Sequence, residues 1–224
     1  RRSKRDSTGN AAKAVAKLGP NVKIGAIAPK AAAEEYGLKI LAEGIQDVPD
    51  NKTTFVLLQN EATVRQVVVG IIGINGRFGQ MLKGFFEQLG CSVIGSDERK
   101  PTGLSNAQVV EQSEVVVFSV PIKDTPAIIR SVLPKVRENQ LLMDVTSVKQ
   151  PAVEAMLESR AQVVGLHPMF RPEVPFDGQT VVACPARLTA SDWKTWVVNM
   201  LTATRAQIKW STPAEHDGYM TTVQ

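Results

Sequence analysis

The chain has 224 residues, enough for one large domain or two modest ones. Hydrophobic residues make up 43% of it and charged residues 21%, which is typical of a globular protein and excludes a disordered or fibrous chain. The 26 basic residues interleave with 22 acidic ones, so the net charge of +4 does not favour a nucleic-acid partner. No apolar run approaches a membrane span and no signal peptide opens the chain, so we expect a soluble, cytoplasmic protein with no membrane partner.

Residues 1–60 are expected to form a small, partial α/β unit. In chain order they contain an alanine-rich stretch at 11–16, a short apolar run at 24–28, a helix over 31–45 and a strand over 54–58. A unit of about 60 residues buries little surface, so we expect it to rely on other parts of the protein. Because the chain starts without methionine and stops inside a predicted helix, we also expect it to be a piece of a longer protein.

Residues 61–212 are expected to form a second, larger domain. Apolar, β-branched runs alternate there with amphipathic stretches, which indicates a Rossmann-like, doubly wound α/β fold with a mainly parallel sheet. A further helix should begin at Pro213, so residues 213–224 would start a truncated helical domain. Strands are predicted at 66–72, 92–96, 114–120, 140–145, 162–166, 179–184 and 207–210, the last two not necessarily parallel, and helices at 77–89, 125–136, 150–159 and 190–203.

A glycine-rich turn follows the first strand of this domain and opens a helix. Gly73, Gly76 and Gly79 form the pattern G-x-x-G-x-x-G, a variant of the dinucleotide-binding fingerprint. Glycine lets the backbone approach a pyrophosphate, and the helix N-terminus offers free N–H donors. An ordinary tight turn is the alternative. We predict that the loop, with Arg77 and Phe78, binds a cofactor.

An acidic residue supports a nicotinamide cofactor. Asp97 ends the second strand, at the position where a carboxylate accepts hydrogen bonds from the adenosine ribose and repels the extra phosphate of NADP. NAD is therefore expected ahead of NADP, although Arg99 and Lys100 could instead hold a 2′-phosphate. Ser119 and Pro121 end a later strand at the same edge. We assign both to the cofactor site, and an ordinary turn is the alternative.

Cysteine and histidine are scarce in this chain. Cys91 and Cys184 lie in apolar, strand-like runs, which predicts buried thiols, and together with two histidines they lack metal-ligand spacing, so no metal site is expected. His167 follows a strand and could accept a proton at neutral pH, although many strand-end histidines are structural. Ser147 ends the preceding strand and should face the same crevice, or act only as a helix N-cap. His216 lies near the start of the last helix, where it could also be an exposed polar residue of the first turn.

Residues 67–224 resemble the nucleotide-binding half of prephenate dehydrogenase, in the version related to chorismate mutase fusion enzymes. The resemblance rests on four motifs besides the glycine loop: Ser119-Val120-Pro121-Ile122, Ser147-Val148-Lys149, Gly165-Leu166-His167-Pro168-Met169-Phe170 and Glu215-His216-Asp217. It implies NAD-dependent oxidative decarboxylation of prephenate to 4-hydroxyphenylpyruvate in tyrosine biosynthesis, by a homodimer in the full-length protein.

The resemblance also implies roles for individual residues. His167 would take the proton of the substrate's ring hydroxyl as hydride leaves for the nicotinamide. Ser147 would hold His167 and the substrate hydroxyl in position. His216 and Lys149 would bind the substrate. Arg171 departs from the family pattern, because glycine usually follows the Met-Phe pair.

Residues 6–59 resemble the end of the catalytic region of prephenate dehydratase. The matching stretches are Ser7-Thr8, Ala26-Ile27-Ala28, Ala33-Glu34-Glu35-Tyr36-Gly37-Leu38 and Asn51-Lys52-Thr53-Thr54-Phe55, where the family normally has arginine in place of Thr54. Both families act on prephenate, so a dehydratase segment joined to a dehydrogenase would combine two activities on one substrate.

The sequence leaves two alternative functions open. One is a non-catalytic NAD-binding or regulatory module, and the other is a Rossmann dehydrogenase for another small hydroxy acid.

Overall fold

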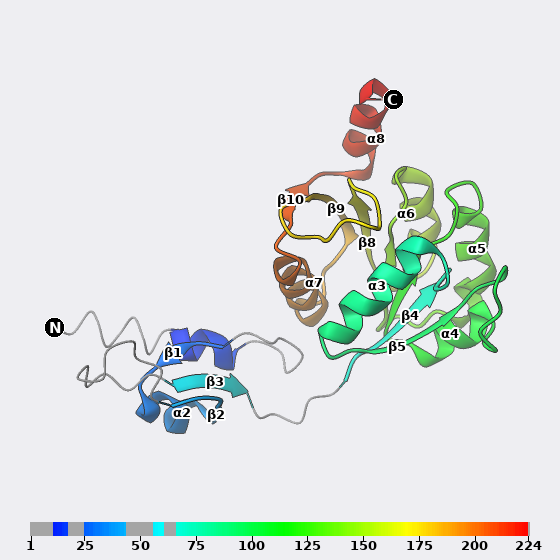
Figure 1. Ribbon diagram of the computed structural model, residues 1–224. Coiled ribbons are helices and arrows are strands. Elements are labelled where there is room, and N and C mark those ends of the chain that lie inside the picture. Colours follow the sequence, from blue (N-terminus) through cyan, green and yellow to red (C-terminus); the bar gives the residue numbers. More distant parts are fainter. Residues whose placement is uncertain (1–10, 18–24, 44–55, 61–65, 224) are drawn as a thin grey trace. The chain divides into compact units, whose positions relative to one another are not determined.

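The computed structural model describes residues 11–17, 25–43, 56–60 and 66–223. The chain divides into two compact units, residues 1–65 and residues 66–224 (Figure 1). The stretch at 51–55, which carries part of the dehydratase resemblance, lies outside the described residues. All of the site described below belongs to the second unit.

The first unit contains a three-stranded antiparallel sheet. Its strand order is β1-β3-β2, made by β1 (Ile27–Ala28), β3 (Val56–Asn60) and β2 (Leu38–Ile40), with helix α2 (Lys30–Tyr36) between β1 and β2. Residues 11–16 are helical. The prediction of one helix over 31–45 is wrong, because Gly37 adopts a left-handed conformation (φ 61°) that ends α2 and sends the chain into a strand.

The second unit is built on a seven-stranded sheet of order β10-β9-β8-β7-β6-β4-β5 (Figure 1). Five strands from β5 to β8 run parallel, β9 runs antiparallel to β8, and β10 runs parallel to β9. The strands are β4 (Val68–Ile72), β5 (Ser92–Ser96), β6 (Val115–Phe118), β7 (Leu141–Asp144), β8 (Gln162–Pro168), β9 (Thr180–Arg187) and β10 (Gln207–Trp210).

Helices cover both faces of this sheet. Successive strand residues point to opposite faces, so Ile71 packs in one apolar cluster with α3 and α7, and Ile72 packs in the other with α4, α5 and α6. The helices are α3 (Arg77–Gln88), α4 (Asn106–Gln112), α5 (Thr125–Val132), α6 (Gln150–Leu157), α7 (Ser191–Ala203) and α8 (Pro213–Val223), with a 3₁₀ turn at Leu133–Lys135. This arrangement confirms the predicted Rossmann-like fold.

Helix α4 was absent from the sequence prediction. It is only seven residues long, and it begins with a capping box in which the Gln108 N–H donates to Ser105 Oγ (3.3 Å) and the Ser105 N–H donates to Gln108 Oε1 (2.9 Å). Val109 and Val110 are buried against the sheet. The Ser-x-x-Gln spacing before two valines was the signal that could have revealed it.

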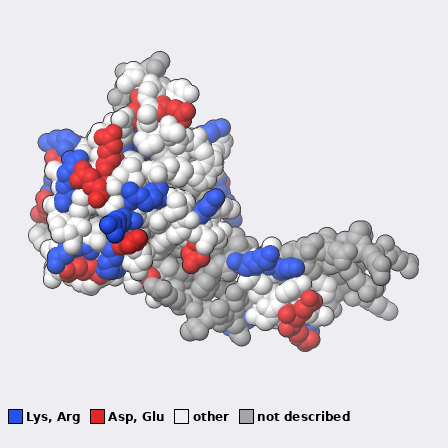
Figure 2. Space-filling view, turned by 180° about the vertical axis from the view of Figure 1, so that it is seen from behind, with Lys and Arg blue, Asp and Glu red and all other residues white. Residues whose placement is uncertain are grey.

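The two cysteines are free and buried, as predicted. Basic and acidic side chains are interleaved over the described part of the face that Figure 2 shows, so that face offers no extended single-sign surface. Within the described ranges no helix has the length and apolar character needed to cross a membrane.

Candidate functional site

A cleft of about 1290 Å³ lies at the carboxyl edge of the parallel strands. The ends of β4, β5, β6, β7 and β8 all contribute to its lining, because parallel strands bring their carboxyl ends to one edge of a sheet. Nine of the predicted site residues line it: Gly73, Gly76, Arg77, Phe78, Asp97, Ser119, Pro121, Ser147 and His167.

The glycine loop at one end of the cleft is tightly packed. Gly73 has a φ of 89°, and a Cβ there would lie 2.3 Å from the carbonyl oxygen of Ser119 on the adjoining strand end. Gly79 does not line the cleft, but a Cβ on it would lie 2.2 Å from the carbonyl oxygen of Gly73. Glycine at these two places is therefore required by the close approach of loop, strand and helix.

Helix α3 begins at the cleft without a side-chain cap. Its N-cap residue is Gly76, which has no side chain, so no N-cap side chain accepts a hydrogen bond from the first N–H groups of the helix. Such a helix end suits a phosphate. Arg77, expected to bind the cofactor, is exposed, and its Nη1 forms an ion pair with Glu173 Oε1 at 2.8 Å.

Asp97 follows β5 at the rim of the cleft. Its Oδ2 accepts a hydrogen bond from the backbone N–H of Asn75 (3.2 Å), and its Oδ1 accepts from the N–H groups of Arg99 and Lys100 (both 3.0 Å). Three backbone donors thus fix the carboxylate beside the glycine loop. This is the placement that the spacing of the two motifs predicts.

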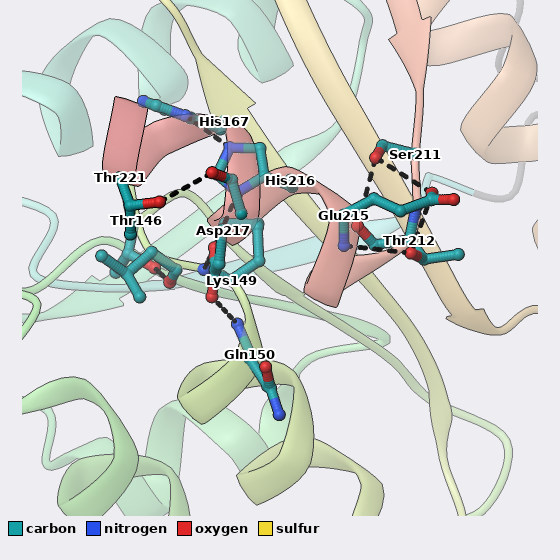
Figure 3. A network of polar contacts seen from close by, with 12 residues as sticks. Thr146, Lys149, Gln150, His167, Ser211, Thr212, Glu215, His216, Asp217 and Thr221 are labelled. Carbon is teal, nitrogen blue, oxygen red and sulfur yellow. Dashed lines mark hydrogen bonds and ion pairs between the residues drawn. The ribbon is translucent and has the colours of Figure 1, made fainter. Parts of the chain in front are cut away.

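His167 is the next-to-last residue of strand β8, and only 8% of its surface is exposed. Its Nδ1 lies 2.9 Å from Nε2 of His216, and Nδ1 of His216 lies 2.7 Å from Oδ1 of Asp217 (Figure 3). Burial, assisted by the positive charge of Lys149 and by His216, lowers the pKa of His167 to about 4. The imidazole is therefore neutral at pH 7 and able to accept a proton.

Lys149 lies beneath the cleft and is completely buried. Its ammonium forms an ion pair with Asp144 and donates a hydrogen bond to the carbonyl oxygen of Leu166 (2.6 Å). Burial lowers the pKa of Lys149, and Asp144 opposes that shift. Lys149 does not line the cleft, so the expectation that it contacts the substrate directly is not supported, and it instead holds the strand that carries His167.

The sequence of this unit matches a family model. Residues 97–210 match the model described as prephenate dehydrogenase, nucleotide-binding domain. The chain belongs to the prephenate dehydrogenase family. Residues 1–63 match a second model, prephenate dehydratase, so a dehydratase segment precedes the nucleotide-binding domain. The first match begins at residue 97, so the glycine loop lies outside it and its assignment rests on geometry.

Individual relatives agree with this placement. The protein named probable arogenate/prephenate dehydrogenase of Methanocaldococcus jannaschii is 30% identical, over 70% of this chain and 39% of the relative. The T-protein of Haemophilus influenzae is also 30% identical, over 78% of this chain and 45% of the relative. The chain thus spans less than half the length of these two relatives.

Solved structures confirm the fold. Synechocystis arogenate dehydrogenase has a TM-score of 0.59 at 19% identity, with 70% of this chain and 64% of that chain covered. Aquifex aeolicus prephenate dehydrogenase has a TM-score of 0.57 at 19% identity in its complex with hydroxyphenyl propionate and NAD+, with 71% and 64% covered.

Two features of this dehydrogenase-family site differ from the sequence expectation. His216 does not line the cleft. It is 3% exposed, and its Nε2 contacts Nδ1 of His167. Asp217, which carried no predicted role, accepts hydrogen bonds from the N–H groups of Lys149 (2.7 Å) and Gln150 (2.8 Å) and contacts His216. Its place in the Glu215-His216-Asp217 motif was the only sequence signal for it.

Proposed function

We propose that this chain is the NAD-binding, base-carrying part of a prephenate dehydrogenase of tyrosine biosynthesis, joined to a dehydratase-like segment at residues 1–60. The observation that carries the proposal is the shared cleft, in which a neutral, buried His167 and the glycine loop line one space. Ligands of open α/β folds bind at this edge. A likeness to proteins named for prephenate and arogenate supports the substrate class.

The residues present fit NAD. The loop at 73–79 has the close glycine packing that brings backbone to a pyrophosphate, and α3 presents an uncapped N-terminus. The Asp97 carboxylate is fixed at the rim, where it would accept hydrogen bonds from ribose hydroxyls and repel a 2′-phosphate. NAD when bound would supply the hydride acceptor, and NADP is the less suitable coenzyme.

The chemistry of this chain's own residues is proton transfer. His167 accepts the proton of the substrate's ring hydroxyl as the carbon bearing that hydroxyl is oxidised. The bond between the ring and its carboxylate then breaks, its electron pair enters the ring, and carbon dioxide leaves. The ring oxygen becomes a phenolate, which takes the proton back from His167 to give 4-hydroxyphenylpyruvate. Ser147 lines the same cleft and would hydrogen-bond the hydroxyl.

Formation of NADH tests the proposal directly. The protein is mixed with NAD and with prephenate or arogenate, and NADH absorbance is followed for the wild type and for His167→Asn. We expect turnover by the wild type with one of the two substrates and a loss of about 10²-fold or more in the variant. Binding of NAD should be unchanged in His167→Asn, which separates loss of the base from loss of the fold.

A non-catalytic NAD-binding or regulatory module is the second candidate, because the glycine loop and the uncapped N-terminus of α3 would suit NAD whether or not His167 acts as a base. It predicts calorimetric binding of NAD without NADH production from either prephenate or arogenate. A panel of other small hydroxy acids tests the third possibility, a different substrate.

Coenzyme choice has its own test at Asp97. Replacing Asp97 with alanine should lower the affinity for NAD relative to NADP, because the ribose acceptor and the charge that repels the 2′-phosphate are both lost. Calorimetric titration with each coenzyme measures the ratio. Glu98→Ala is the matched control, since Glu98 carries the same charge one residue further along the cleft. A ratio that stays at the wild-type value in Asp97→Ala would remove the ribose assignment.

A further inference from the structure

We propose that Asp217 is a positioning residue that acts through His216 to fix the tautomer of His167, so that His167 carries its proton on Nδ1 and presents an unprotonated Nε2 to the cleft. The proposal deepens the proposed function, because the tautomer decides which nitrogen can serve as the base. The hydrogen-bond chain itself does not depend on that function.

The order of donors and acceptors starts at Asp217. Oδ1 of Asp217 accepts the backbone N–H of Lys149 (2.7 Å) and Oδ2 accepts that of Gln150 (2.8 Å). Burial raises the pKa of Asp217, but these two hydrogen bonds and the contact with His216 outweigh burial and bring the pKa below its usual range. An ionised carboxylate can only accept, so Nδ1 of His216, 2.7 Å from Oδ1, must be the donor.

The remaining steps apply when both rings are neutral, because a neutral imidazole has one N–H and one bare nitrogen. With its proton on Nδ1, His216 has a bare Nε2, which lies 2.9 Å from Nδ1 of His167. That contact needs one donor, so His167 carries its proton on Nδ1. Its Nε2 is then unprotonated on the side of the ring away from His216 (Figure 3). His167 also lines the cleft.

Burial is the main factor that opposes protonation of His167. The charge of Lys149, on the segment that leads into α6, also opposes it, and the charge of Asp217, on α8, favours it. The two rings meet nearly edge to face, with centroids 5.1 Å apart. Because Asp217 is held by backbone groups at the start of α6, the tautomer depends on how α8 packs on α6.

Nuclear magnetic resonance can read the tautomers directly. The chain has only two histidines, so selective ¹⁵N labelling of histidine gives two imidazole signals, which His216→Gln assigns. Once the pH is high enough that the two signals no longer change, we expect each ring to carry its single proton on Nδ1. A wild-type spectrum in which His167 is protonated mainly on Nε2 would overturn the proposal, whatever happens to any variant.

Asp217→Asn tests the cause. An asparagine cannot place acceptor oxygens toward both the backbone donors and His216, so the Nε2-protonated form of His167 should become populated. Glu215→Gln is the matched control, because Glu215 lies on the same helix and its carboxylate accepts hydrogen bonds from Ser211 and Thr212. Tautomer ratios equal to wild type in Asp217→Asn, or an equal change in both variants, would count against the proposal.

Kinetics separates this inference from the proposed function. If the wild type turns over substrate, Asp217→Asn should lower kcat by about 10- to 100-fold and change KM by less than about 2-fold, because a general base in the wrong tautomer cannot accept the proton. An inactive wild type with the expected tautomers would refute the proposed function alone. An active wild type with Nε2–H on His167 would refute the positioning role alone.

Discussion

Replacing Lys149 with methionine should destabilise the unit of residues 66–224 by about 3–5 kcal/mol. The side chains of Lys149 and Asp144 are both completely buried, so the substitution leaves a carboxylate without its cation where water does not reach. It also removes the donor to the carbonyl oxygen of Leu166 (2.6 Å). Methionine nearly matches lysine in length, so little cavity forms and the loss is mainly electrostatic.

Urea unfolding followed by tryptophan fluorescence measures this loss. The three tryptophans, Trp193, Trp196 and Trp210, all belong to the second unit, so the signal reports that unit alone. With a urea dependence of roughly 1–3 kcal/mol per molar, a loss of about 3 kcal/mol lowers the midpoint by at least about 1 M. The slope of the transition should be unchanged, because the surface exposed on unfolding is the same.

Lys135→Met is the matched control. Lys135 forms an ion pair with Glu111 at 2.7 Å, but the two side chains are 50% and 46% exposed, so its loss should cost less than about 1 kcal/mol. Adding Asp144→Asn to Lys149→Met should restore part of the stability, because the orphaned charge is removed. Equal midpoints for Lys149→Met and Lys135→Met, or no recovery in the double variant, would refute the argument from buried charge.

The other two predictions concern pH and backbone strain. Because the folded pKa of His167 is about 4 and its ordinary value is 6.5, the unfolded chain binds the proton first, so stability is full above pH 6.5 and falls by up to about 3 kcal/mol toward pH 4. Urea midpoints across this range should fall less steeply in His167→Asn, and parallel curves would contradict the shift. Gly73→Ala should cost at least about 2 kcal/mol, because alanine resists the positive φ and meets the Ser119 carbonyl. Gly76→Ala, whose nearest contact would be the Gly73 carbonyl oxygen at 3.2 Å, should cost clearly less in the same assay, and equal losses would count against the packing argument.

Local sequence signals predicted much of the second unit. The Val115–Phe118 run is apolar at every position, which is typical of a strand covered on both faces, and the structure buries all four residues. The sequence also predicts that the turn at 73–79 and His167 lie at one edge of the sheet, because the carboxyl ends of parallel strands meet there. In the structure both line one cleft. Short elements were harder, since a seven-residue helix such as α4 contains too few residues to show a clear period.

The contacts behind the base could not be predicted in this way. The family resemblance implied that Lys149 binds the substrate, yet its long side chain turns inward to Asp144. Whether a polar side chain faces a cleft or a buried partner depends on which groups the fold brings near it. The order of residues along the chain does not show which groups these are.

By itself the sequence determined the Rossmann-like sheet, the glycine turn and the strand-end histidine, because each depends on residues close together in the chain. Only the tertiary structure decided that His216 and Asp217 lie next to His167, because 49 residues separate His167 from His216 along the chain. That contact exists because α8 packs on α6 and β9, and such packing is fixed by side chains from several distant segments at once.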